Sequence, residues 1–308
     1  MDNIQVNSVK AWILAARPKT LTGAAVPVLV GLTLALADSN FLHPEVSGTF
    51  LGNGVPAILC LLFALAMQID ANFINDYYDF IKGTDREDRL GPKRACAEGW
   101  ITPKAMRMGI AVATVLACCI GLPLIIYGGL EMIGIGLLCV IFAFLYTTSL
   151  SYLGAGDILV IVFFGFIPTC IPYYLELKTM TWECILAGFT VGLVTDNLLM
   201  INNFRDRVQD KLSGKKTLIV RLGETWGKYL YLGIGILATL LCLGFIPSGK
   251  WVAAVLPWLY LLIHYTTWKK MVKINYGREL NKILGESARN ILIFGVLLIV
   301  GFLASLFV

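Results

Sequence analysis

Nine apolar segments, each about 20 residues long, recur along the whole chain and leave little room for a water-soluble core. The sequence is 57% hydrophobic and only 15% charged, whereas a soluble domain carries about 25% charged residues. Segments of this length are typical of membrane-spanning helices, and their recurrence excludes a single anchor. We therefore expect an all-α membrane protein with about nine transmembrane helices. The segments cover residues 20–37, 55–75, 106–127, 130–149, 157–176, 183–203, 229–246, 251–268 and 288–308.

Lysine and arginine residues are concentrated on one side of this predicted bundle. The segment before the first span and the connections after the second, sixth and eighth spans hold 23 of the 25 basic residues. Only Lys178 and Lys250 fall on the opposite side. The positive-inside rule then predicts a cytoplasmic N-terminus and an external C-terminus. The net charge of +5 accordingly indicates a membrane face and anionic ligands, and it does not call for nucleic acid.

The second span ends in a stretch that is dense in amides and carboxylates. Its polar residues share one face of the predicted helix, because residues three and four apart lie above one another. They are Gln68, Asn72, Asn75, Asp76 and Asp79. An ionised acid in hydrocarbon costs at least about 2.5–3.5 kcal/mol, so several acids on one face need a partner. A hard metal ion with oxygen ligands is the simplest candidate.

The sixth span carries a second acidic face. Asp196, Asn203, Asp206 and Asp210 lie on one side of the helix, with Asp206 and Asp210 one turn apart. Four spans separate Asp76 from Asp206, so both helices run in the same direction and end on the same side. This weak repeat predicts two four-helix halves plus one helix, which enclose a central cavity with both acidic helix ends at its mouth.

Basic residues follow each acidic face. Acids followed by cations at a membrane edge suggest a magnesium–diphosphate site, since Mg²⁺ prefers a few carboxylates together with phosphate oxygens. Arginine and lysine then bind the remaining phosphate charge. The alternative is that these cations are stop-transfer charges solvated at the membrane boundary. They are Lys82, Arg89, Lys93 and Arg94 after the first face and Lys211, Lys215, Lys216 and Arg221 after the second.

Both acidic stretches resemble the two aspartate-rich motifs of the UbiA superfamily of intramembrane prenyltransferases. The first reads Asn75-Asp76-Tyr-Tyr-Asp79 and the second reads Asp206-Arg-Val-Gln-Asp210. The similarity runs nearly end to end and is strongest to the branch that acts on 1,4-dihydroxy-2-naphthoate in menaquinone synthesis. Two positions depart from the pattern. Gly83 stands where the superfamily often has a third Asp, with Asp85 two residues later, and Asp157 stands where the branch is expected to have Glu.

The resemblance implies a UbiA-like fold with one transmembrane prenyltransferase domain over residues 1–308, whose active site is capped by cytoplasmic loops at about 80–105 and 204–228. It implies transfer of a polyprenyl group from polyprenyl diphosphate to 1,4-dihydroxy-2-naphthoate. Loss of CO₂ and diphosphate then gives demethylmenaquinol. The expected location is the bacterial inner membrane, with the mouth of the active site facing the cytoplasm and the prenyl tail in a groove open to the lipid.

The resemblance also assigns roles to residues. Two Mg²⁺ ions are expected to neutralise the leaving diphosphate, and Lys82 and Lys215 are expected to assist catalysis electrostatically. The expected metal ligands are Asp76, Asp79, Asp206 and Asp210, with Asn72 and Asn75 as further ligands or supports. Expected substrate-binding residues are Gln68, Asn72, Asn75, Lys93, Arg94, Tyr146, Asp157, Asn203, Lys216 and Arg221.

Asp196 has no counterpart in the family motifs. It lies on the acidic face of its helix, about 15 Å deeper than Asp206 by helical rise. We expect Asp196 to open on the cavity and to orient or deprotonate the acceptor, and the alternative is a hydrogen-bonded structural acid. Asp70 points away from the first polar face, so we expect no direct role for it.

Two other functions stay open from the sequence. The first is a UbiA-type prenyltransferase with another aromatic acceptor, such as 4-hydroxybenzoate or homogentisate. The second is a membrane carrier, since nine spans with an internal repeat and intramembrane acids permit one. A carrier usually places its site near the bilayer midplane, whereas these acids lie at the cytoplasmic edge beside many cations, which favours the enzyme.

Overall fold

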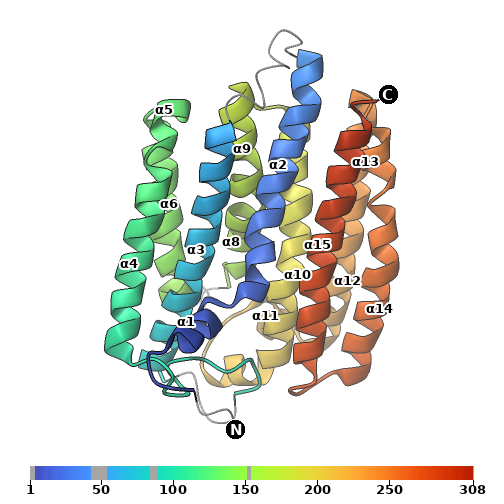
Figure 1. The fold of residues 1–308 in the computed structure, drawn as a ribbon. Helices are drawn as coiled ribbons and strands as arrows, with labels where there is room; N and C mark the ends of the chain where they lie inside the picture. Colours follow the sequence, from blue (N-terminus) through green and yellow to red (C-terminus); the bar gives the residue numbers. More distant parts are fainter. Residues whose placement is uncertain (1–3, 43–53, 84–88, 151–153, 308) are drawn as a thin grey trace.

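The structure, a computed structural model, describes residues 4–42, 54–83, 89–150 and 154–307. Within these residues the regular secondary structure is helical, without strands. The long helices run side by side along one axis, and the described chain begins and ends at opposite ends of the bundle (Figure 1). Eight helical segments are long and apolar enough to cross a membrane. The predicted all-α membrane fold is therefore confirmed.

The first half of the chain supplies four crossings of the bundle. Helix α1 and the 3₁₀ turn η1 lie across one end, and α2 leaves them toward the other end (Figure 1). The elements are α1 (Val9–Ala16), η1 (Pro18–Thr20), α2 (Leu21–Leu42), α3 (Gly54–Ile81), α4 (Pro103–Gly121), α5 (Leu124–Gly128), α6 (Glu131–Leu145) and the π-helical turn η3 (Tyr146–Leu150).

The second half supplies the remaining crossings. Its elements are α8 (Gly156–Ile161), η4 (Val162–Phe166), α9 (Ile167–Leu177), α10 (Trp182–Leu212), α11 (Leu218–Leu222), α12 (Glu224–Leu241), η5 (Cys242–Ser248), α13 (Trp251–Val255), α14 (Trp258–Ile274) and α15 (Leu280–Ala304). Helices α3 and α10 are each the second crossing of their half, as the internal repeat predicts. Both continue beyond their apolar part, so each acidic stretch is helical.

The predicted eighth span, residues 251–268, consists of two helices. Helix α13 has five residues and α14 has 17, with Pro257 at the junction. Neither helix alone is long enough to count among the eight candidate spans. Together they run beside α12 and α15 from one end of the bundle to the other (Figure 1). With this interrupted crossing the described residues cross the bundle nine times, and this odd number explains why the described chain begins and ends at opposite ends.

Helix α10 is the central element of the fold. In its most apolar window 78% of the residues are buried, whereas no other candidate span exceeds 50%. Its contact with η4 is close because two glycines meet there. A Cβ atom on Gly165 would lie 2.2 Å from the Cα atom of Gly192. Small residues thus allow these membrane helices to approach each other.

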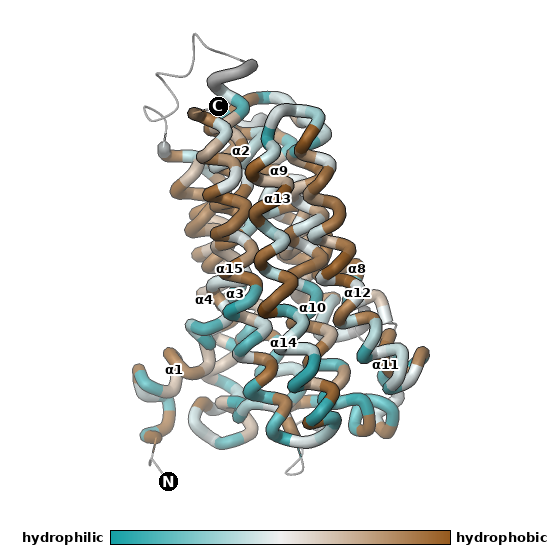
Figure 2. The backbone as a smooth tube through the Cα atoms, turned by 90° about the vertical axis from the view of Figure 1, so that its right-hand side faces the viewer, coloured by the Kyte–Doolittle hydropathy of each residue, from teal (hydrophilic) through white to brown (hydrophobic). Residues whose placement is uncertain are grey.

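Hydrophilic residues gather at the end of the bundle that carries α1 and α11, and hydrophobic residues cover the helices beyond it (Figure 2). Helix α2 packs against α3, α9, α10 and α15, so it joins the two halves. The acidic ends of α3 and α10 lie at the hydrophilic end of the molecule. We call this the site end, and the other the opposite end.

Candidate active site

Two cavities follow one another along α3 and α10. The first has a volume of about 520 Å³, and its walls include Asn75 of α3 and Asn202 of α10. The second has a volume of about 500 Å³, and its walls include Asp79 and Asp206, which lie one helical turn further along the same two helices. Both acidic helix ends therefore face one site, as the internal repeat predicts.

The first cavity is mostly apolar. Residues of α2, α3, α4, α5, α6, α8, η4, α9 and α10 line it. Its apolar walls include Val28, Cys60, Leu124 and Met132, which belong to one buried hydrophobic cluster. Its polar side chains lie toward the site end and include Arg17, Thr20, Gln68, Asn72, Asn75, Tyr146, Thr195 and Asn202. A cavity of this kind suits a long hydrocarbon chain with a polar head.

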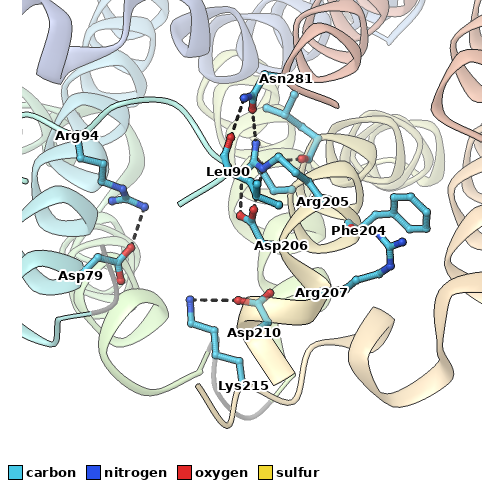
Figure 3. A network of polar contacts seen from close by, with 12 residues as sticks. Asp79, Leu90, Arg94, Phe204, Arg205, Asp206, Arg207, Asp210, Lys215 and Asn281 are labelled. Carbon is cyan, nitrogen blue, oxygen red and sulfur yellow. Dashed lines mark hydrogen bonds and ion pairs between the residues drawn. The ribbon is translucent and has the colours of Figure 1, made fainter. Parts of the chain in front are cut away.

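The second cavity is lined by acids and bases, and we call it the acid–base pocket. Arg94 Nη2 lies 2.7 Å from Asp79 Oδ2, and Lys215 Nζ lies 3.6 Å from Asp210 Oδ1. Asp79 comes from α3, whereas Asp210 and Lys215 come from the end of α10 and the following loop, on the other side of the pocket (Figure 3). The pocket is lined by Asp79, Lys82, Gly83, Arg89, Leu90, Arg94, Thr148, Asp206, Gln209, Asp210, Leu212, Ser213 and Lys215.

Asp206 is held by its neighbour in the sequence. Arg205 donates from Nε and Nη2 to the two carboxylate oxygens of Asp206, at 2.8 and 2.6 Å (Figure 3). Such a two-point contact fixes the plane of the carboxylate. Asp206 still lines the pocket, and each of its oxygens keeps a lone pair for another partner.

Asp76 differs from the expected metal ligand. Its two carboxylate oxygens each accept a backbone N–H at 2.8 Å, one from Ala95 and one from Cys96. The side chain is buried and is absent from the walls of both cavities. Asp76 therefore anchors the connection between α3 and α4, which carries Arg89 and Arg94. Asp76 and Asp79 are three residues apart, which is less than one full turn of the helix, so their side chains point in different directions. Only Asp79 lines the acid–base pocket.

The amides on the polar face of α3 also have partners within the protein. Asn72 donates to the carbonyl of Ala16 at 2.9 Å and to the hydroxyl of Thr20 at 3.0 Å. Gln68 donates weakly to the Thr20 hydroxyl, at 3.4 Å. These bonds tie α3 to the corner between α1 and α2, while Asn75 Oδ1 accepts the hydroxyl of Thr147 at 2.7 Å.

Arg17 lines the apolar cavity, although the sequence analysis assigned it no role in the site. It adopts a left-handed backbone conformation, with φ of 51°, between α1 and η1. This strained conformation turns its side chain into the apolar cavity, within electrostatic range of Asp76, Asp79 and Arg94. No hydrogen bond or ion pair of the Arg17 guanidinium occurs within the described part of the chain. The signal in the sequence was an arginine directly before a proline at the start of the first span.

Lys82 lies between the acid–base pocket and the end of α6. Its Nζ donates to the carbonyls of Thr147 and Thr148, at 3.2 and 2.7 Å. Partial burial lowers the pKa of Lys82 from its ordinary value, and nearby Lys215 acts in the same direction, whereas Asp79 raises it. Lys82 thus brings positive charge to the pocket wall, as expected.

Several predicted substrate-binding residues lie outside both cavities. Lys93 is exposed and pairs with Glu98 of the same loop at 2.7 Å, so its ammonium group is directed away from the pocket. The carbonyl of Lys216 and the guanidinium of Arg221 pack beside Gly154. Asn203 and Asp157 line neither cavity, whereas Arg94 and Tyr146 do line one. The residues outside the cavities belong to loops or to neighbouring faces of helices. A helical wheel does not predict where a loop side chain points or which helix face borders a cavity.

Asp196 is buried on α10, and both of its oxygens are without a hydrogen-bond partner in the described residues. Thr195, Leu198, Leu199 and Asn202 present the cavity-lining face of α10, and Asp196 does not share it. The expected opening of Asp196 on the cavity is therefore not found. Asp70 accepts a hydrogen bond from Thr114 of α4 at 2.7 Å and lines neither cavity. Asp85 lies outside the described residues.

The donor set of the site fits Mg²⁺. Asp79, Asp206 and Asp210 supply carboxylate oxygens and Asn75 supplies an amide oxygen, which are the hard ligands that Mg²⁺ prefers. No three acidic, histidine or cysteine side chains converge as a ready metal cage within the described residues. Mg²⁺ that is bound by one or two carboxylates and completed by substrate phosphates needs no such cage.

Comparison with known proteins decides the family. The model of the UbiA prenyltransferase family matches residues 24–283. The chain belongs to the UbiA prenyltransferase family. A 1,4-dihydroxy-2-naphthoate octaprenyltransferase from Escherichia coli is 34% identical over 85% of this chain and 84% of its own length. A relative with the same name from Mycobacterium tuberculosis is 32% identical over 79% of this chain and 80% of its own length. The predicted resemblance is confirmed, and the protein is a membrane prenyltransferase.

Solved UbiA structures share the fold at low sequence identity. A UbiA homologue from Aeropyrum pernix superposes with a TM-score of 0.66 at 15% identity, covering 91% of this chain and 97% of that one. A homologue from Archaeoglobus fulgidus, bound to DMAPP and Mg²⁺, superposes with a TM-score of 0.58 at 15% identity, covering 93% of this chain and 98% of that one. The helical bundle of this chain is thus the UbiA fold.

Proposed function

We propose that the protein transfers a polyprenyl group from polyprenyl diphosphate to 1,4-dihydroxy-2-naphthoate, with loss of CO₂ and diphosphate. The observation that carries the acceptor is the shared name of four relatives that are 31–36% identical over most of this chain. The donor is supported by the geometry, since an acid–base pocket adjoins an apolar cavity.

The acid–base pocket is proposed to bind the diphosphate. Asp79, Asp206, Asp210 and the amide of Asn75 would hold two Mg²⁺ ions, which supply charge neutralisation of the leaving group. Arg17, Lys82, Arg94 and Lys215 would donate to phosphate oxygens, because each brings a cation to a cavity wall. Asp76 would act through the loop that it anchors, by placing Arg94.

The apolar cavity is proposed to hold the prenyl chain. Departure of diphosphate leaves an allylic cation at the junction of the two cavities. Tyr146, Phe163 and Phe164 line the apolar cavity and offer aromatic faces to this cation, worth about 1–2 kcal/mol each where water is excluded. Exclusion of water by these walls also protects the cation until the acceptor ring attacks it.

The site end is proposed to face the cytoplasm of a bacterial cell, with the bundle in the inner membrane. This orientation follows from the 23 basic residues on that side. The single domain would be capped by the connections at about 80–105 and 204–228. Arg89, Leu90 and Arg94 of the first connection line the acid–base pocket. Those of the second are Asp206, Gln209, Asp210, Leu212, Ser213 and Lys215.

The test is an assay of the purified protein in lipid nanodiscs with Mg²⁺ and a polyprenyl diphosphate. Dihydroxynaphthoate, 4-hydroxybenzoate and homogentisate are supplied in turn, and products are identified by mass spectrometry. We expect prenylated, decarboxylated product from dihydroxynaphthoate and none after chelation of Mg²⁺. Product from another acceptor alone would overturn the proposed acceptor and keep the enzyme class.

A further inference from the structure

Asn281, at the start of α15, touches two walls of the acid–base pocket without lining it. Its Oδ1 accepts a hydrogen bond from Arg205 Nη1 at 2.8 Å, and its Nδ2 donates to the carbonyl of Leu90 at 2.8 Å (Figure 3). Arg205 in turn donates two hydrogen bonds to the carboxylate of Asp206. One amide therefore connects α15, α10 and the α3–α4 connection.

The position of Asn281 is set by the hydrophobic core beside it. Leu280 and Ile283 of α15 are fully buried against Met200, Ile201 and Phe204 of α10. This packing holds the first turn of α15 at a fixed height on α10. Asn281 lies between the two core residues and presents its amide toward Arg205, so the bond is built into the packing of the two helices.

The backbone of the α3–α4 connection also packs against the Arg205 side chain. It is 2% exposed, and a Cβ atom on Gly91 would lie 2.9 Å from its Nη2 atom. The absence of a side chain at Gly91 thus lets the connection lie directly on the guanidinium. Arg278, also ahead of α15, donates to the carbonyl of Arg89 at 3.4 Å. The segment that carries Arg89 and Leu90 is therefore attached to α10 and α15 together.

Only a side chain with both a donor and an acceptor can make the two bonds of Asn281, because a guanidinium offers only donors and a carbonyl only acceptors. We propose that Asn281 is a positioning residue that couples the α3–α4 connection to Asp206 through Arg205, so that the loop wall and the carboxylate wall of the pocket are placed as one unit. The proposal rests on the proposed diphosphate-binding function of the pocket. It gives the ninth helix, which lies outside both four-helix halves, a part in the site.

Two variants separate the two bonds. Asn281→Asp keeps an acceptor for Arg205 and loses the donor to Leu90, whereas Asn281→Leu keeps the volume and loses both bonds. Lys282→Ala is the matched control, since Lys282 is the next residue and forms only an exposed pair with Glu279. Each protein is assayed for turnover against prenyl diphosphate and Mg²⁺ concentration. Amide hydrogen exchange of residues 89–100 is measured in the same preparations.

We expect Asn281→Leu to raise both the KM for prenyl diphosphate and the Mg²⁺ concentration at half-maximal rate, by about tenfold, as when a partner of a metal ligand is removed. The amides of Ala95 and Cys96, which Asp76 protects, should exchange faster in both variants. Asn281→Asp should show the faster exchange with a smaller change in Mg²⁺ dependence. Lys282→Ala should match the wild type.

Unchanged exchange and unchanged Mg²⁺ dependence in both Asn281 variants would overturn the coupling. If Asn281→Leu does not fold, Asn281→Asp still decides, because wild-type exchange in that variant is the overturning result. The exchange measurement needs no acceptor. Faster exchange in a protein that does not prenylate dihydroxynaphthoate would therefore support the coupling and reject only the proposed acceptor.

Discussion

Acid–base pairs that are buried or half-buried occur at both ends of the bundle, and they differ in what surrounds them. At the site end, Asp79–Arg94 and Asp210–Lys215 line a cavity of about 500 Å³. At the opposite end, Lys250 Nζ lies 2.8 Å from Asp38 Oδ1, and the hydroxyl of Tyr173 donates to Asp38 Oδ2 at 2.7 Å. Asp38 and Lys250 are only 4% and 8% exposed.

The two ends differ in whether the protein itself supplies a further hydrogen-bond donor to the paired acid. Asp38 receives two donors from the protein, and the Tyr173 oxygen is itself satisfied by the hydroxyl of Thr181 at 3.0 Å. This network joins α2, α9, the start of α10 and the start of α13, so it closes that end of the bundle. The pairs of the site end keep room for a ligand beside them. Similar ion pairs thus join helices at one end and line an open cavity at the other.

The largest expected effect is loss of turnover without loss of structure at the site end. In Asp210→Asn the size of the side chain is kept, and a negative charge that faces the pocket is removed. Its partner Lys215 is 3.6 Å away and 20% exposed, so water can solvate the ammonium group in the variant. We expect kcat to fall about 10³-fold, while the thermal midpoint in detergent stays close to that of the wild type. Glu279→Gln, an exposed acid near the same end, is the control. Substantial turnover of Asp210→Asn at saturating Mg²⁺ would contradict the assigned role.

A substitution at the opposite end should lower the unfolding free energy and leave kcat unchanged. Asp38→Asn leaves the Lys250 ammonium buried without a counter-charge. Breaking a buried pair on one side typically costs about 3–5 kcal/mol of unfolding free energy. Unfolding in a denaturing detergent titration measures this change, and kcat per folded molecule should be that of the wild type.

The double variant Asp38→Leu with Lys250→Met sharpens this test. Removing both charges together should restore most of the lost stability, because no unpaired charge remains. If Asp38→Asn were fully folded yet inactive, the opposite end would take part in the reaction and the contrast between the ends would be wrong.

The smallest expected effect concerns Arg17, the cation at the mouth of the apolar cavity. Arg17→Met keeps an unbranched apolar stem and removes the charged guanidinium group. We expect kcat/KM for prenyl diphosphate to fall about 10–100-fold, the range for one hydrogen bond to a charged group. Lys19→Met, an exposed cation two residues further on, should leave kcat/KM unchanged. Equal losses in both variants would indicate a general surface-charge effect.

Much of this organisation could be predicted before the structure. The spans followed from the length of the apolar segments, and the convergence of α3 and α10 followed from the even number of spans between two acidic faces. Asp79, Asp206 and Asp210 were recognised because acids on one helical face in a membrane need a cation. The interruption of the eighth span at Pro257 was missed, because hydropathy averaged over a window does not register a short break.

The chemistry of individual side chains was harder to predict. Asp76 and Asp79 belong to one motif, and a helical wheel places them on the same face. They differ in the structure because two backbone N–H groups of the α3–α4 connection donate to Asp76, whereas Asp79 lines the acid–base pocket. Lys93 and Arg94 are adjacent, yet Lys93 pairs with Glu98 while Arg94 reaches Asp79.

By itself the sequence determined the membrane class, the number and direction of the crossings, and the presence of two acidic helix ends on one side. These properties depend on hydrophobic length, charge distribution and helical periodicity, which are local. The tertiary structure decided which acids face the pocket, that Arg17 enters the site, and that Asn281 of the last helix touches both pocket walls. Those outcomes depend on where loops and distant helices return, and hydrogen bonds between residues 190 or more positions apart leave no local pattern in the sequence.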